Sequence, residues 1–264
     1  MPYRVDIAHA GDTVLDRLVD LGALDVERSP DGGIAALMPD AVAPERVARA
    51  LGVEDVSVSP AVGRDAESVW ILSQRPTRIG RLRIVPAHGA TESDALRLSD
   101  SAAFGTGLHP TTALCLEAIE EELELSIPGS LLDVGTGSGV LALAALLMGV
   151  PRALGLDIDE DALRVAAENS RLNAFERRLR LVRGGPDAVA GTWPLVVANL
   201  LAAPLIELAP VLVRRVGHHG RLVLAGIPAS LERDVDRAYR RLGMHDVRAH
   251  SRAGWSALVL QASW

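Results

Sequence analysis

Three glycines follow a short apolar stretch in the segment LLDVGTGSGVLALAALLMG, at positions 135, 137 and 139. The residues before them are typical of a buried strand, and those after them are typical of an apolar helix. In an open α/β sheet, ligands bind beyond the carboxyl ends of strands, where a glycine-rich turn lets the backbone approach them. The N-terminus of the next helix favours negative charge at the same place. Gly135 and Gly137 are therefore predicted to line a ligand site.

The second candidate is Asp157, which lies in the next apolar stretch, ALGLDID, 22 residues after Gly135 (157 minus 135). A carboxylate at the tip of the neighbouring strand can accept hydrogen bonds from both hydroxyls of an adenosine ribose. A dinucleotide turn, G-x-G-x-x-G, needs a glycine where this chain has Val140, so no nicotinamide cofactor is expected. The turn fits the first motif of S-adenosylmethionine-dependent methyltransferases better. Asp159 and Glu160 are interpreted as cap and first-turn residues of the following helix.

A third candidate segment, AFGTGLHPTTALCLEAIEE, lies upstream and contains Phe104, Gly105 and Thr106. Pro110 suits the first turn of a helix, which places Thr112 at the positive end of that helix. Such a segment can fold over a bound cofactor and contact its carboxylate. The alternative, a capped helix start without a ligand, explains the proline and the threonines but leaves Phe104 and the two glycines unexplained.

Asn199 ends a later apolar stretch, VVANL, and is the candidate catalytic residue. Its side-chain carbonyl can hold an amine or the cofactor. The residues after it are Leu200, Leu201 and Ala202, so no aromatic side chain follows the asparagine.

Other reactive side chains are given structural or solvated roles. Cys115 is predicted to be a buried small hydrophobe. His218 and His219 are predicted to be solvated, because no carboxylate or cysteine stands at ligand spacing. The acidic run EEELE at 120–124 is predicted to be a solvent-exposed helix face, with attraction of a basic substrate as the alternative.

The composition is that of an ordinary soluble protein: 264 residues, of which 48% are hydrophobic and 23% charged. The net charge of -7 disfavours nucleic acid as a direct partner and suits a basic protein. All 27 basic residues are arginine. The single cysteine excludes an internal disulfide and a multi-cysteine metal site, and no metal is expected. With neither a signal peptide nor a membrane span recognisable, a cytoplasmic location is expected.

The order of apolar patterns predicts two domains and an α/β fold. Residues 1–60 alternate as strand, helix, two strands, helix and strand, which is the ferredoxin-like order. Residues 61–101 are expected to be a linker with strands at RLRIVP and ALRLS. From residue 102 to 264, strands alternate with helices, which predicts a Rossmann-like parallel sheet. The last two strands are expected to form an antiparallel edge pair around a glycine turn.

The chain then shows a specific resemblance. AFGTGLHPTTALCLEAIE, DVGTGSGVLALAAL, GLDIDEDAL and VVANLLAAPLIELAP follow in this order within about 110 residues. This set resembles the ribosomal protein L11 methyltransferase family, class I enzymes that use S-adenosylmethionine. The resemblance implies cofactor contacts by Thr112, Gly135, Asp157 and Asn199. The remaining expected cofactor residues are Phe104, Gly105, Thr106, Gly137 and Ile158.

The resemblance also implies a function. The expected reaction is methylation of amino groups, on lysine side chains or at the N-terminus, of a basic protein of the large ribosomal subunit. Residues 1–60 would dock this substrate, and the enzyme is expected to be a monomer. The chain reads SDSA where the family usually has a Pro-Gly pair, and its linker keeps only Trp70. Methylation of another protein or a small amine therefore stays open, as does a non-catalytic cofactor-binding role.

Overall fold

The computed structural model describes residues 3–8, 11–23, 25–28, 32–39, 41–52, 56–60, 62–63, 70–71, 77–87, 95–99, 110–252 and 254–264. The structural statements below concern these residues. Within them, no helix combines the length and the apolar composition that crossing a bilayer requires.

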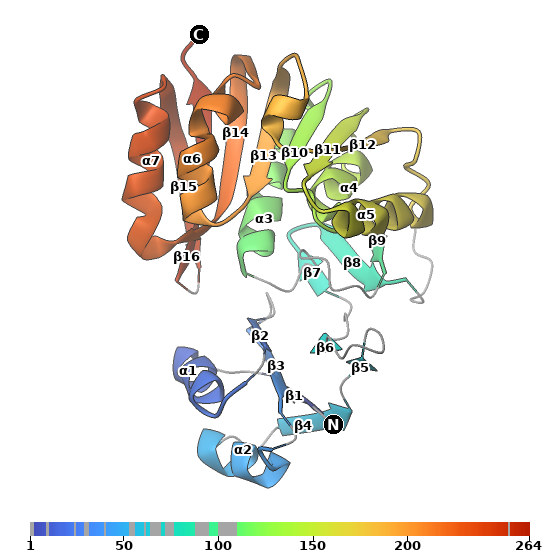
Figure 1. Ribbon diagram of the computed structural model, residues 1–264, viewed down its shortest axis with the longest axis vertical. Helices are drawn as coiled ribbons and strands as arrows, with labels where there is room; N and C mark the ends of the chain where they lie inside the picture. The colour runs from blue at the N-terminus through green and yellow to red at the C-terminus, as the bar shows by residue number, and fades with distance from the viewer. Residues whose placement is uncertain are drawn as a thin grey trace.

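The N-terminal segment forms a small sheet with two helices (Figure 1). Its elements are β1 (Tyr3–Ile7), α1 (Asp12–Asp20), β2 (Asp25–Arg28), β3 (Ile34–Met38), α2 (Pro44–Leu51) and β4 (Val56–Pro60). The strands pair antiparallel in the order β2-β3-β1-β4, as the ferredoxin-like pattern predicts. Val5, Leu18, Met38 and Val47 are fully buried in a core of their own. Gly52 ends α2 as its C-cap residue with φ 63°, a conformation that favours glycine.

Five short strands follow in the range predicted to be a linker: β5 (Val62–Gly63), β6 (Trp70–Ile71), β7 (Thr77–Ile79), β8 (Leu82–Pro86) and β9 (Ala95–Leu98). Strands β7, β8 and β9 form one sheet. Their buried side chains, including Ile79, Ile84 and Leu96, belong to the same core as the helices of the larger sheet. Because a shared core makes these strands part of one packed unit, we propose that the C-terminal domain begins near residue 77.

The larger sheet has the strand order β12-β11-β10-β13-β14-β16-β15 (Figure 1). Strands β10 to β14 are parallel, and β16 runs antiparallel to both β14 and β15. This mixed sheet confirms the Rossmann-like prediction and the antiparallel ending. Its elements are α3 (Pro110–Leu125), β10 (Leu131–Val134), α4 (Val140–Leu147), β11 (Ala153–Asp157), α5 (Glu160–Leu172), β12 (Leu179–Arg183), β13 (Trp193–Asn199), α6 (Ala202–Val213), β14 (Val216–Pro228), α7 (Glu232–Arg240), β15 (Met244–Arg252) and β16 (Trp255–Ala262), with 3-10 turns at Pro186–Ala188 and Ala229–Leu231.

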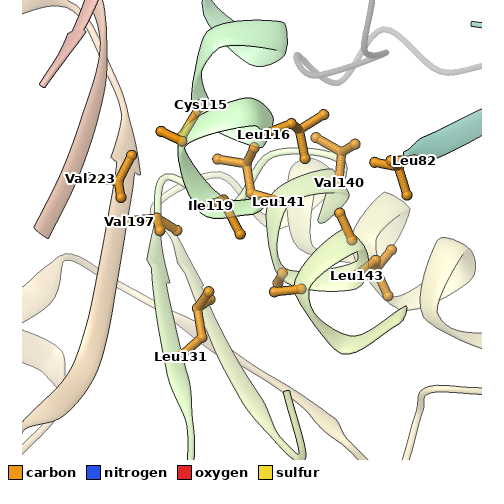
Figure 2. Close-up of a cluster of buried hydrophobic side chains, with 14 of the residues drawn as sticks. Leu82, Cys115, Leu116, Ile119, Leu131, Val140, Leu141, Leu143, Val197 and Val223 are labelled. Atoms are coloured by element: carbon orange, nitrogen blue, oxygen red, sulfur yellow. The ribbon is translucent and has the colours of Figure 1, made fainter. Parts of the chain in front are cut away.

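Two apolar cores lie on the two faces of this sheet. On one face, α3 and α4 pack against the strands, and Figure 2 shows side chains of both helices meeting Leu131, Val197 and Val223. On the other face, α6 and α7 cover Leu132, Val196 and their neighbours. Strands buried on both faces need continuous apolar runs, and this explains sequences such as LVV and LVLA in the central strands.

Candidate functional site

The glycine turn lies between β10 and α4, at the carboxyl end of the first strand. Gly135, Gly137 and Gly139 all have positive φ, at 74°, 55° and 82°, which favours glycine at each position. The amides of Gly135 and Thr136 both donate to the carbonyl of Leu156 on β11, at 2.9 and 2.8 Å. These hydrogen bonds fix the glycine turn against the end of β11, so that one ligand can contact both the turn and the strand end.

Asp157 ends β11 beside this turn. Its Oδ2 accepts the amide of Gly137 at 2.9 Å, and its Oδ1 accepts the amide of Asp159 at 3.0 Å. Each carboxylate oxygen has two lone pairs, so each keeps capacity for a further donor. The side chain is thus held in place while both oxygens can still receive a hydroxyl group.

Of the residues that follow Asp157, Ile158 is exposed to solvent and the next two lie at the start of α5. Ile158 is 76% exposed, which leaves an apolar surface next to the carboxylate. Asp159 caps α5 by accepting the amide of Asp161 at 2.9 Å, as its predicted role requires. Glu160 opens the helix and pairs with Arg183 at 2.8 Å. Neither acidic residue therefore competes with Asp157 for the role at the strand tip.

Asn199 and Thr112 meet although 87 residues separate them in the sequence. Asn199 ends β13, and its Nδ2 lies 3.4 Å from Oγ1 of Thr112, a long contact for a donor to a hydroxyl. Thr112 is fully buried in the first turn of α3, which begins at the predicted Pro110. The fold thus brings the ends of β13 and α3 together.

Leu200 closes the space between Asn199 and the glycine turn. A Cβ on Gly135 would lie 2.5 Å from Cδ2 of Leu200, so another residue there would displace the Leu200 side chain and would also be strained at φ 74°. A Cβ on Gly226 would lie 2.3 Å from the Leu200 carbonyl oxygen. Both glycines let β13, β14 and the turn approach one another, and Gly135, Asp157 and Asn199 therefore lie at one end of the sheet.

A buried carboxylate lies beneath the turn and was not singled out from the sequence. Asp133 is fully buried on β10, where its Oδ2 accepts Oγ1 of Thr136 at 2.7 Å and the amide of Ala142 at 3.3 Å. Burial raises the pKa of Asp133 to about 7, against the opposing effect of these two hydrogen bonds. A carboxylate within the apolar stretch LLDVG was the available signal.

Several predicted residues lie apart from this arrangement or outside the described residues. Phe104, Gly105 and Thr106 belong to residues 100–109, which the structure does not describe. Cys115 is fully buried, as predicted, and burial raises the pKa of its thiol well above the ordinary range. His218 and His219 are exposed, as predicted, in the long strand β14.

The prediction of an exposed acidic face on α3 is wrong for two of its residues. Glu120 is 9% exposed and Glu122 is 6% exposed. Glu120 accepts Nε of Arg81 at 2.7 Å, and Glu122 pairs with Nε of Arg221 at 3.0 Å and with Arg248. These arginines come from distant segments, so the helical pattern alone could not reveal the pairing.

A cavity adjoins the site between the first turns of α5 and strand β12. Of the predicted cofactor residues, only Ile158 lines it. Most of its remaining lining residues are charged, namely Asp159, Glu160, Asp161, Arg164 and Arg183. Because neither Asp157 nor the glycine turn faces this cavity, we place the candidate site at the strand ends.

The strand order, the glycine turn after β10 and the carboxylate ending β11 together define a Rossmann-like class I methyltransferase. The family model described as "Ribosomal protein L11 methyltransferase (PrmA)" matches residues 41–263. The chain belongs to this family.

Relatives named ribosomal protein L11 methyltransferase match the larger part of the chain. One from Ectopseudomonas mendocina (strain ymp) is 44% identical over 181 residues, which is 67% of this chain and 61% of the relative. One from Geobacter sulfurreducens is 41% identical over 189 residues, 70% of this chain and 62% of the relative. The matched part of the chain thus spans about three fifths of the length of these relatives.

A solved structure also matches. The crystal structure of a ribosomal protein L11 methylase from Lactobacillus delbrueckii subsp. bulgaricus superposes with a TM-score of 0.63 and 30% identity. The match covers 70% of this chain and 96% of that one. It supports the same fold for the matched part of the chain.

Proposed function

We propose that this protein uses S-adenosylmethionine to methylate amino groups of ribosomal protein L11, on lysine side chains or at the N-terminus. Family membership supports the reaction and the substrate. The observation that carries the cofactor assignment is the carboxylate of Asp157, which two amides hold in place and which retains acceptor capacity on both oxygens.

The described residues fit this cofactor. Asp157 would accept the two ribose hydroxyls, and the exposed Ile158 would offer an apolar surface to the adenine ring. The turn at Gly135 and Gly137 would let the backbone approach the bound molecule. Phe104, Gly105 and Thr106 are proposed to complete the site on the evidence of their sequence alone.

Asn199 is proposed as the catalytic residue, supported by its position. It ends the strand next to the glycine turn, and Thr112 lies within 3.4 Å of its amide nitrogen. Its side-chain carbonyl would accept a hydrogen bond from the substrate amine and so direct the nitrogen lone pair. Holding the reacting atoms in line supplies most of the rate in a displacement of this kind.

The protonation state of the amine sets the second requirement. A lysine amine has a pKa of about 10.4 in water and is therefore mostly charged near neutral pH. Only the neutral form carries the lone pair that attacks. Desolvation and a neighbouring positive charge both lower an amine pKa, and the bound S-adenosylmethionine would supply that charge together with the methyl group. Since the leaving group is a neutral thioether, the chain requires no general acid.

The expectations of a monomer, of a cytoplasmic location and of no direct contact with nucleic acid stay predictions. The same is true of substrate docking by residues 1–60.

The test uses the complete chain. Purified protein is incubated with methyl-labelled S-adenosylmethionine and the mixed proteins of the large ribosomal subunit, and labelled bands are identified by mass spectrometry. We expect label on L11 amino groups. Label on a different protein, or on an added small amine alone, would support the alternative substrates, and cofactor binding without any transfer would support a non-catalytic role.

A further inference from the structure

Asn169 on α5 is fully buried and joins two segments that lie far from it in the sequence. Its Oδ1 accepts the amide of Ser99 at 2.7 Å and the hydroxyl of Ser99 at 2.9 Å. Its Nδ2 donates to the carbonyl of Ser138 at 2.9 Å. Ser99 directly follows β9, and Ser138 lies in the glycine turn. One amide side chain therefore connects α5, the end of β9 and the candidate cofactor turn.

The bond to Ser138 helps to orient one peptide plane of the glycine turn. The carbonyl of Ser138 and the amide of Gly139 belong to the same planar peptide unit and point in opposite directions. Asn169 holds the carbonyl, and the Thr136 carbonyl accepts the Gly139 amide at 2.8 Å. The unit lies between the Cα atoms of Ser138 and Gly139, and glycine by itself imposes little preference on its orientation. The side chain of Asn169 thus adds a restraint that the backbone of Gly139 does not supply by itself.

Helix α5 supports the turn at a second, adjoining point. A Cβ on Gly139 would lie 3.1 Å from Cβ of Ala166, so the helix packs directly on the turn one helical turn before Asn169. Tight packing of this kind transmits a shift of the helix to the turn. The two contacts fix both the position of the turn and the direction of its peptide groups.

Asn173, the C-cap residue of α5, provides a comparison. Its Oδ1 accepts the amide of Arg97 at 2.9 Å, and its Nδ2 donates to the carbonyls of Arg97 and Asn169, both at 2.7 Å. Asn173 therefore anchors the same strand, β9, through the same chemistry. In the part of the chain that the structure describes, its hydrogen bonds reach β9 and its own helix but not the glycine turn.

We propose that Asn169 is a positioning residue for the cofactor, acting through the peptide unit between Ser138 and Gly139. The inference rests on the proposed function, because it assumes that the turn contacts S-adenosylmethionine. Asn169 itself need not touch the cofactor. It keeps the turn in one conformation before the cofactor arrives, so that binding does not have to order the backbone.

The test compares Asn169→Asp with Asn173→Asp. Each substitution keeps the side-chain oxygen that accepts a backbone amide, from Ser99 in one case and from Arg97 in the other. Each also removes the side-chain NH2 group, but only Asn169→Asp thereby removes the donor to the Ser138 carbonyl. Affinity for S-adenosylhomocysteine is measured by calorimetry at a temperature where thermal unfolding curves show both variants folded. We expect the dissociation constant to rise roughly tenfold in Asn169→Asp, as for the loss of one buried hydrogen bond. In Asn173→Asp it should change less than about twofold.

Hydrogen exchange gives a second readout that needs no ligand and serves if Asn169→Asp is too unstable for titration. In Asn169→Ala, amides of residues 135–139 should exchange faster than in Asn173→Ala. Suppose that the unsubstituted protein binds S-adenosylhomocysteine. Equal losses of affinity in the two aspartate variants, or equal exchange rates in the turn of the two alanine variants, would then contradict the role of Asn169 but not the proposed function. An unsubstituted protein that fails to bind it would overturn the proposed function and this inference together.

Discussion

The side chain of Asp157 is held in place by hydrogen bonds and can still accept hydrogen bonds from a ligand. Two backbone amides hold its oxygens, at 2.9 and 3.0 Å, without using all of their lone pairs. A carboxylate on a flexible side chain would lose conformational entropy on binding two hydroxyls. The side chain of Asp157 at the end of β11 is already ordered in the folded protein, so it loses less entropy when a ribose binds.

Asp157→Asn should weaken binding of S-adenosylmethionine by roughly tenfold or more, because a charge-assisted hydrogen bond contributes about 1.5–3 kcal/mol. Calorimetry on the folded variant measures this directly. Asp161→Asn is the control, since Asp161 lies on the exposed side of α5 and pairs with Arg164. An unchanged affinity in Asp157→Asn would contradict the assignment of this residue to the ribose.

Sequence reasoning could locate Asp157, Asn199 and Thr112 because each lies where an apolar stretch begins or ends. It could not find Asp133 or Asn169, which lie inside such stretches or on a helix. The role of Asn169 depends on Ser99, 70 residues earlier, and on Ser138, 31 residues earlier. A buried polar residue is recognisable only once the fold shows which groups it must satisfy.

At the level of elements, β10 carries an ionisable group into the core. With a pKa of about 7 in the folded protein and about 3.8 when unfolded, Asp133 takes up a proton on folding between these values. Stability therefore falls as pH rises from about 4 to about 7, by up to about 1.4 kcal/mol per pH unit, and stays reduced above that range.

Asp133→Asn should remove this dependence, because the amide is uncharged and its oxygen can still accept from Thr136 and Ala142. The melting temperature of the variant minus that of the unsubstituted protein should increase from pH 4.5 to pH 8. Differential scanning calorimetry at four or five pH values measures it. If the difference between the two melting temperatures is the same at every pH, the carboxyl group of Asp133 does not titrate in this range.

Helix α3 is held to the sheet by ion pairs of unequal burial. Glu122 is 6% exposed and meets Arg221 and Arg248, whose side chains are 25% and 31% exposed. Glu124 is 55% exposed and meets Arg81, which is 71% exposed. Buried pairs are costly to break, whereas exposed pairs contribute little.

Glu122→Gln should destabilise the protein by about 2 kcal/mol, because Arg221 loses a buried counterion and Arg248 is left with the more exposed Glu121. Glu124→Gln is the matched control and should change stability by less than about 0.5 kcal/mol. Urea denaturation measures both. Similar small losses in the two variants would show that the acidic run acts as a solvated face after all.

On the scale of the whole molecule, the first sixty residues have a core of their own, whereas strands β7 to β9 share the core of the larger domain. The alternating patterns predicted the order of strands and helices in both parts. They predicted that the second part begins at residue 102, whereas the shared core leads us to propose a start near residue 77. The patterns gave little sign of this, because β7 has only three residues and its buried side chains pack in a core with distant helices. They also left open that β16 lies between β14 and β15.

Deleting the residues before Gly63 should therefore leave the larger core and the candidate site intact. We expect affinity for S-adenosylmethionine within about twofold of the full chain, since no residue proposed to bind it is removed. Methylation of intact L11 should fall at least about tenfold, because remote binding energy that orients the amine is lost. Both are measured on one truncated sample. An unchanged methylation rate would mean that substrate docking lies elsewhere.

The ion pairs of α3 also constrain when this domain can acquire its native structure. Glu117 pairs with Arg252, 135 residues later, and Glu122 pairs with Arg248, 126 residues later. At a synthesis rate of about 5–20 residues per second, Glu117 and Glu122 are made roughly 6 to 27 seconds before these two arginines. Contacts of such long sequence separation also slow the search for the native state. We therefore expect the larger domain to complete its folding only after residue 252 has been synthesised and can reach α3, with Glu117 and Glu122 hydrated until then.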